Sequence, residues 1–183
     1  MQVKSDSPFP LSLDLAGTSG CAAYQFRRTS RAVARLYDAA LAPAGLRSTQ
    51  FAILTAIAKL QPIAMSRVAE ILVIDAATMT RSLRLLQKDG LIEIAPRGLR
   101  RQRLLTLTLK AEKALAVAVP LWREAQARFL ASLGSEWKAI RNELERAAEV
   151  AVSLEAIDSA KDTVQHANLS RPKRTVGTKR QPS

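Results

Sequence analysis

Cationic and hydroxyl side chains are concentrated between Ala76 and Arg103. This stretch carries seven basic residues against only Asp89 and Glu93, whereas the stretch from Lys110 to Asp158 carries seven basic and eight acidic residues. Guanidinium and ammonium groups bind phosphate, and arginine also forms paired hydrogen bonds with guanine O6 and N7. The side chains that could bind a partner with many phosphate groups are Thr78, Thr80, Arg81, Ser82, Arg84, Lys88, Arg97, Arg100, Arg101 and Arg103.

The whole chain shares this basic character. It has 183 residues, a formal net charge of +12, 48% hydrophobic residues and 4% aromatic residues. A chain of this length can bury the core of one domain, and its positive excess favours a polyanion as partner. Low periodicity predicts a flexible arm over residues 1–20 and a disordered basic tail over residues 158–183. The tail is either a solubilising end or a sequence-independent phosphate contact.

Several classes of protein are excluded by what the sequence lacks. One cysteine and one histidine rule out a disulfide framework and a four-ligand zinc site. There is no phosphate-binding glycine loop, no G-x-S-x-G turn and no histidine within residues 21–157 to act as a base. We therefore expect no enzymatic activity, no metal and no cofactor. Without a membrane-spanning apolar run or a signal peptide, we expect a cytoplasmic protein.

Apolar spacing of three and four residues predicts helices that position these side chains. The first three run over residues 21–41, 49–60 and 66–72, and the fourth covers residues 76–89, with Asp75 as N-cap and Gly90 at its end. Residues 91–96 and 103–109 alternate apolar and polar side chains, which predicts a β-hairpin with a basic tip. Thr108 then caps a long helix, whose inward positions include Leu115, Val119, Trp122, Gln126 and Phe129.

Three short helices followed by a basic hairpin are the element order of a winged helix-turn-helix. In that fold the last of these three helices, here residues 76–89, enters the major groove of DNA. The hairpin, or wing, reaches the backbone or minor groove. The alternative is that the charges form an ordinary solvated face, and the basic hairpin next to the helix argues against it.

The sequence from Gly45 to Ile94, "GLRSTQFAILTAIAKLQPIAMSRVAEILVIDAATMTRSLRLLQKDGLIEI", resembles the MarR family of bacterial transcriptional regulators. Arg101, followed by Leu107 and Thr108, extends the similarity. The resemblance implies a mainly helical fold with a small β-hairpin wing. It implies a domain over residues 21–157, with the winged helix-turn-helix at about 46–108 and dimerisation helices at about 21–42 and 109–157. The order that carries the match is Asp75, Thr78, Thr80, Arg81, Leu83, Leu86, Gly90 and Leu91.

The resemblance also implies a function. Members bind pseudo-palindromic promoter sites as homodimers and leave the DNA when a small aromatic or anionic effector binds or a cysteine is oxidised. Arg101 falls where the family's wing arginine enters the minor groove. Two departures lower the expectation of sequence discrimination: Leu99 replaces an aspartate that orients this arginine, and Ala76 and Ala77 stand where arginine and serine are common.

A seam of apolar residues on the last helix needs a partner surface. Its residues recur at steps of three and four over nearly three heptads, which is typical of a helix that pairs with another. We expect it to form the interface of the homodimer, and the alternative is that the helix folds back onto its own subunit. The seam consists of Trp137, Ile140, Leu144, Ala147, Ala151 and Leu154.

Two further sites are hypotheses. Phe26, Tyr37 and Phe51 are aromatic residues near the junction of the first helix with the DNA-binding helices, and they form either an effector pocket or part of the core. Cys21 lies near the position at which one branch of the family senses hydroperoxides, but alignment places that position at Ala23. Cys21 is therefore either a redox site or an inert thiol.

The sequence thus predicts a homodimeric, effector-responsive DNA-binding regulator, most simply a repressor. The alternative is an architectural DNA-coating protein with no effector and little sequence preference.

Overall fold

The computed structural model describes residues 20–95 and 103–169, with side chains described up to Lys161. The chain divides into two compact units, Met1–Phe129 and Leu130–Ser183. The predicted arm, the predicted wing tip with Arg97, Arg100 and Arg101, and the end of the predicted tail lie outside the described residues.

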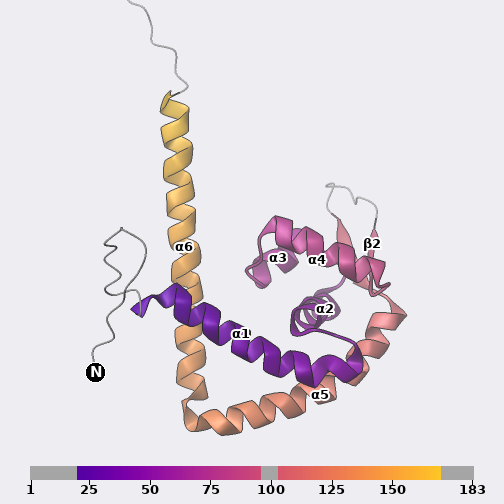
Figure 1. Cartoon of the computed structure of the whole chain (residues 1–183). Coiled ribbons are helices and arrows are strands. Elements are labelled where there is room, and N and C mark those ends of the chain that lie inside the picture. Colours follow the sequence, from indigo (N-terminus) through magenta and orange to yellow (C-terminus); the bar gives the residue numbers. More distant parts are fainter. Residues whose placement is uncertain (1–19, 96–102, 170–183) are drawn as a thin grey trace, which may run out of the picture. The chain divides into compact units, whose positions relative to one another are not determined.

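The first unit contains the predicted helices and hairpin in the predicted order (Figure 1). The fold is mainly helical with a small antiparallel sheet, as expected. A short 3-10 turn follows the first helix at Ala42–Ala44. The elements are α1 (Ala22–Leu41), α2 (Ser48–Leu60), β1 (Ile63–Ala64), α3 (Met65–Ile71), α4 (Ala76–Lys88), β2 (Ile92–Ala95), β3 (Leu104–Leu107) and α5 (Leu109–Leu133).

The sheet has one strand more than predicted. Its order is β1-β3-β2, and both pairings are antiparallel. Leu105 in the central strand is fully buried and is paired with Ile63 of β1 on one side and Ile94 of β2 on the other. β1 was missed because a strand of two residues is too short to show an alternating pattern.

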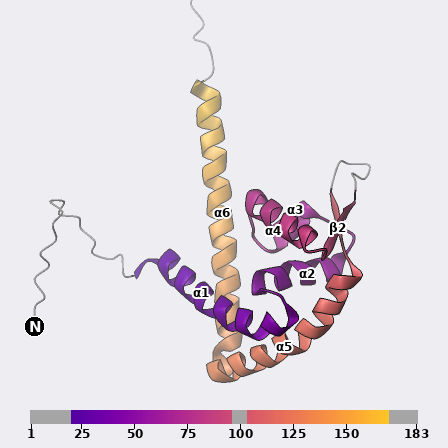
Figure 2. The same cartoon turned by 45° about the vertical axis from the view of Figure 1, so that its right-hand side comes forward.

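The core lies between the sheet and helices α2, α3 and α4, which Figure 2 shows from a second side, and Leu41 of α1 with Ala111 and Ala118 of α5 completes it. α4 buries Met79, Leu83 and Leu86, the face opposite its charged residues. Because helical positions three and four apart share a face, this burial fixes which side of α4 is exposed. The other large, fully buried side chains are Leu41, Ile53, Leu54, Ile57, Val68 and Leu105.

The inward face predicted for α5 is confirmed in part, since Leu115 and Trp122 pack against the core. Its buried positions are Ala111, Ala118 and Ala125, seven residues apart, because small side chains let the helix approach its neighbours closely. The larger residues expected to point inward are only half-buried and flank this line. They are Leu115, Val119, Trp122, Gln126 and Phe129.

Helices α3 and α4 end in the same hydrogen-bonding pattern. After α3, Ile74 N–H donates to the Ala69 carbonyl (2.9 Å) and Val73 N–H to the Glu70 carbonyl (3.2 Å). After α4, Leu91 and Gly90 make the corresponding bonds, and Gly90 adopts the predicted positive φ of 68°. Both are Schellman motifs, which favour glycine at the positive-φ position. Val73 occupies that position after α3 with φ 51°, a strained conformation for a β-branched residue.

The second unit contains the end of α5, a 3-10 turn (Gly134–Glu136) and α6 (Trp137–Leu169). α6 extends past Asp158, the residue at which the disordered tail was predicted to begin. Residues 158–169 contain neither glycine nor proline, and the first proline beyond them is Pro172, so nothing in this segment stops a helix. An ion pair between Lys161 and Asp158 (3.1 Å) lies at the start of this added segment.

The apolar seam of α6 is largely exposed in the single chain. Trp137 and Ala147 are half-buried, whereas Ile140, Leu144, Ala151 and Leu154 are exposed. Within residues 20–95 and 103–169, no helix combines the length and apolarity that crossing a membrane requires.

Candidate nucleic-acid interface

The N-terminus of α4 is fixed by the predicted cap. The Asp75 carboxylate accepts a hydrogen bond from the Thr78 backbone N–H (2.8 Å). Bonds from the Thr78 hydroxyl and then from its backbone N–H lower the pKa of Asp75, so the cap is ionised at neutral pH. This cap sets the start of α4 and the orientation of its first turn.

The exposed face of α4 carries its cationic residues in one line. The line begins at Ala77 and continues with the three cations Arg81, Arg84 and Lys88, at spacings of four, three and four. All four residues are exposed. Positions at these spacings lie above one another on one side of a helix. Because Met79 and its buried neighbours cover the other side, this line is the face that α4 offers to a partner.

The hydroxyl side chains of α4 are held by the helix itself. Thr80 Oγ1 donates to the Ala76 carbonyl (2.7 Å), and Ser82 Oγ donates to the Thr78 carbonyl (3.0 Å). Their protons are therefore used within the helix, and both oxygens remain available as acceptors. The predicted residues Thr78, Thr80 and Ser82 do share α4 with the arginines, with Thr80 and Ser82 toward the edges of the exposed face.

The base of the hairpin is tied to the same core. The Thr108 hydroxyl donates to the Gly90 carbonyl (2.7 Å), and Lys110 Nζ donates to the Asp89 carbonyl (2.7 Å). The Ala111 N–H donates to Thr108 Oγ1 (3.2 Å), the helix cap that was predicted. Arg103 is exposed, and its carbonyl accepts from Met65 N–H (3.2 Å). The strands of the hairpin are thus anchored to the start of α3 and to the end of α4.

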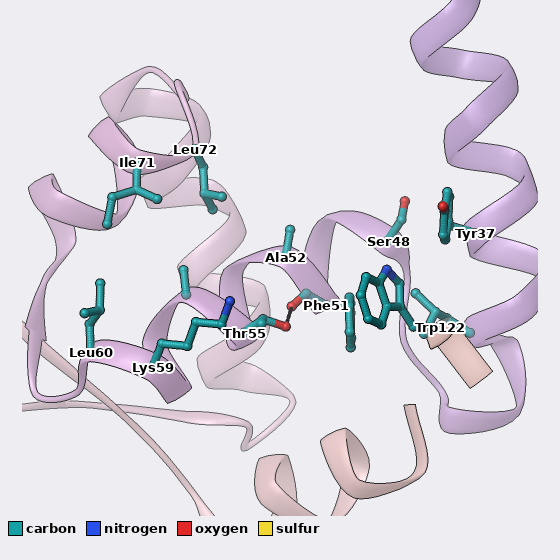
Figure 3. A pocket seen from close by; sticks show the side chains of 12 residues that line it. Tyr37, Ser48, Phe51, Ala52, Thr55, Lys59, Leu60, Ile71, Leu72 and Trp122 are labelled. Carbon is teal, nitrogen blue, oxygen red and sulfur yellow. Dashed lines mark hydrogen bonds between the residues drawn. The ribbon is translucent and has the colours of Figure 1, made fainter. Parts of the chain in front are cut away.

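A cavity of about 470 Å³ lies between α1, α2, α3 and α5 (Figure 3). Tyr37 and Phe51, two of the three residues predicted for an effector pocket, lie in its wall. Phe51 stacks on Trp122, with ring centroids 6.0 Å apart. The other lining residues are Leu41, Ser48, Ala52, Thr55, Ala56, Lys59, Leu60, Ile71 and Leu72.

Phe26 does not line this cavity and is exposed, because it lies three turns before Tyr37 on α1. Lys59 supplies the cavity's one cationic group among the residues that line it. Sequence reasoning missed Lys59 because a lysine on an amphipathic helix gives no sign of facing a cavity. It placed Trp122 on the inward side of α5, but not beside Phe51.

Cys21 is exposed and is the residue before α1. Its surroundings contain no feature in the described part of the chain that assigns it a redox role. Among the described residues, no group of three or more His, Cys, Asp or Glu side chains is placed to hold a metal ion.

Comparisons with known proteins point in the same direction. Residues 44–103 match the profile of the MarR family. The transcriptional regulator MosR of M. tuberculosis, solved in complex with DNA, is 35% identical with a TM-score of 0.68, and the match covers 73% of this chain and 98% of that one. A second structure of MosR gives 35% identity and a TM-score of 0.64, covering 73% and 96%.

A curated relative is the uncharacterised HTH-type regulator YwoH of Bacillus subtilis. It is 28% identical over 90 residues, which are 49% of this chain and 66% of that protein. The match thus spans just under two thirds of the length of YwoH.

Proposed function

The chain belongs to the MarR family of winged helix-turn-helix DNA-binding transcriptional regulators, and from this membership we propose that it is a cytoplasmic homodimeric repressor of a pseudo-palindromic promoter site, released by a small aromatic or anionic effector. The family is one of regulators and not of enzymes. The observation that carries the proposal is the exposed line of Arg81, Arg84 and Lys88 on α4, beside the base of a basic hairpin.

The homodimer is supported by the exposed apolar seam of α6. Ile140, Leu144 and Leu154 retain 37%, 41% and 56% exposure in the single chain, and such a contiguous apolar seam is costly to leave in water. Two copies related by a two-fold axis would present their α4 helices to inverted half-sites about one turn of DNA, roughly 34 Å, apart.

The effector is supported by the cavity at the junction of α1 with α2 and α5. Its wall is apolar and aromatic, with Lys59 as a cation and the hydroxyls of Tyr37, Ser48 and Thr55 as polar groups. Such a lining suits a small aromatic ligand that carries an anionic group. A ligand there can alter DNA binding only if it binds the DNA-bound and free conformations with different affinity.

The experiment that tests the function is selection of duplexes from a random pool by the purified full-length protein at physiological salt. Recovery of an inverted repeat supports the regulator. A pool that stays sequence-blind supports the alternative, an architectural DNA-coating protein, and contradicts our proposal.

A further inference from the structure

The first turn of α4 has neither arginine nor lysine. In a helix-turn-helix, the N-terminal residues of the recognition helix contact the base edges. Here those residues are Ala76, Ala77 and Thr78, and all three are exposed. The first basic residue, Arg81, comes one turn later.

The first turn offers few hydrogen-bond donors from its side chains. Ala76 and Ala77 have only a methyl group, and the one hydroxyl, that of Thr78, lies beside the Asp75 carboxylate whose pKa it lowers. The next hydroxyl, that of Thr80, donates to the Ala76 carbonyl (2.7 Å). What this turn presents outward is therefore a set of methyl groups, with Ala77 on the same line as Arg81, Arg84 and Lys88.

A methyl group can still distinguish bases. In the major groove the C5-methyl of thymine is the one apolar feature of the base edges, and alanine or the threonine methyl packs against it. We propose that Ala77 is a specificity-determining residue that reads a thymine methyl in each half-site. This inference rests on the proposed DNA-binding function. It assigns a base-reading role to Ala77, whereas the sequence alone gave alanine at this position as a departure from the family that lowers the expected sequence discrimination.

The geometry also places the thymine. Ala77 and Arg81 are four residues apart, so their Cα atoms are separated by about 6 Å along the helix axis. Projected on the axis of B-DNA, this separation is at most about two base-pair steps, and arginine pairs best with guanine. Each half-site should therefore contain a thymine within about two or three base pairs of the guanine read by Arg81.

The test removes the methyl from the DNA and from the protein in turn. The site recovered by selection is synthesised with each thymine replaced singly by deoxyuridine, which lacks only the C5-methyl. Affinity of the full-length protein is measured by fluorescence anisotropy. At one symmetry-related pair of thymines, each replacement should lower the affinity of the wild type about fourfold. This is the effect expected when one methyl-sized apolar group loses its contact.

Ala77→Gly should lose affinity for the thymine duplex and show no further loss with deoxyuridine at that position, because the methyl has no partner. Ala77→Ser, which preserves the helix better than glycine, should likewise reduce the ratio between the two duplexes. Lys88→Ala is the matched control on the same line of α4. It should weaken binding to both duplexes equally and keep the wild-type ratio.

The inference is overturned if a repeat is recovered but no thymine in it responds to deoxyuridine, or if Ala77→Gly responds as strongly as the wild type. Those results leave the regulator itself standing. A sequence-blind pool would overturn both the regulator and this assignment.

Discussion

Tyr37 on α1 donates a hydrogen bond from its phenolic hydroxyl to Gln126 Oε1 on α5, across 89 positions of sequence. The same ring meets Phe129 edge-on, with centroids 6.3 Å apart and an interplanar angle of 73°. Tyr37 also lines the cavity. A ligand in the cavity would therefore lie beside the contact that joins α1 to α5.

Tyr37→Phe should remove this hydrogen bond while keeping the ring contact. Burial raises the pKa of Tyr37, so the hydroxyl is a donor throughout the physiological range. We expect the free energy of unfolding to fall by about 1 kcal/mol, because the Gln126 acceptor loses its partner. Urea denaturation measures this change. Tyr24→Phe, at an exposed position of the same helix, is the control, and an equal loss in both variants would contradict the assignment.

Asp38 should make stability depend on pH. Its carboxylate accepts a hydrogen bond from the Ser48 backbone N–H (2.6 Å) and pairs with Arg47 (3.6 Å). The bond from Ser48 first, and the Arg47 charge after it, lower the pKa of Asp38 from its ordinary value of 3.8. Because the folded pKa is the lower one, the stabilisation is complete above the ordinary value and is lost as the pH falls through the folded pKa.

We therefore expect the free energy of unfolding of the wild type to decrease below about pH 4, and Asp38→Asn to lack this part of the decrease. Urea midpoints measured across that range compare the two proteins. Parallel pH profiles would show that the bond from Ser48 does not act on the carboxylate in this way.

Val73→Gly should stabilise the protein. Val73 has φ 51° in the Schellman motif after α3, where glycine carries no steric penalty. We expect a gain of about 1 kcal/mol in the free energy of unfolding, measured by chemical denaturation. The reciprocal change, Gly90→Val at φ 68°, meets no atom within 4 Å of the new Cβ and should cost a similar amount. Stabilisation by both substitutions would refute the argument from backbone strain.

Arg84→Ala and Lys88→Ala should affect DNA binding in different ways. Arginine at a base edge contributes about 1–3 kcal/mol of discrimination, so Arg84→Ala should change which bases a selection recovers. Lys88→Ala should weaken all duplexes similarly and reduce the salt dependence of binding by about one phosphate contact. Equal losses on specific and scrambled duplexes for Arg84→Ala would remove it from base reading. Arg101→Ala, in the segment predicted to form the wing tip, should behave like Lys88→Ala.

Ala52→Leu should block the cavity without altering the DNA surface. Ala52 lines the cavity from α2, and the larger side chain takes up the space beside Phe51. A panel of substituted benzoates is expected to lower the affinity of the wild type for the selected duplex and to leave Ala52→Leu unaffected. Ala58→Leu, on the same helix but away from the cavity lining, is the control. Loss of the response in Ala58→Leu, or its retention in Ala52→Leu, would place the ligand elsewhere.

The sequence predicted the elements that have strong local signals. Asp75, Gly90 and Thr108 mark helix ends by chemistry that depends only on neighbouring residues, and the structure confirms all three. The buried face of α4 follows the helical spacing of Met79, Leu83 and Leu86.

What the sequence did not predict depends on contacts between distant segments. β1 exists because it pairs with β3 some forty residues later, and Trp122 reaches Phe51 only through the packing of α5. The small residues of α5 gave no sign that they would be more deeply buried than the leucines beside them. Phe26 lies outside the lining of the described cavity, because an aromatic residue on an amphipathic helix does not reveal how far along the helix a cavity extends.

Leu105 joins the hairpin to the helix-turn-helix, because it pairs with strands on both sides and lies wholly within the core. If α4 and the hairpin both contact DNA as proposed, their separation is held fixed, and we expect a bound duplex to adopt the curvature that lets it touch both. Base-pair steps that bend easily would then raise the affinity of the site, even where no side chain contacts the bases. Part of the operator's sequence would then be selected by the stiffness of the DNA and not by any contact.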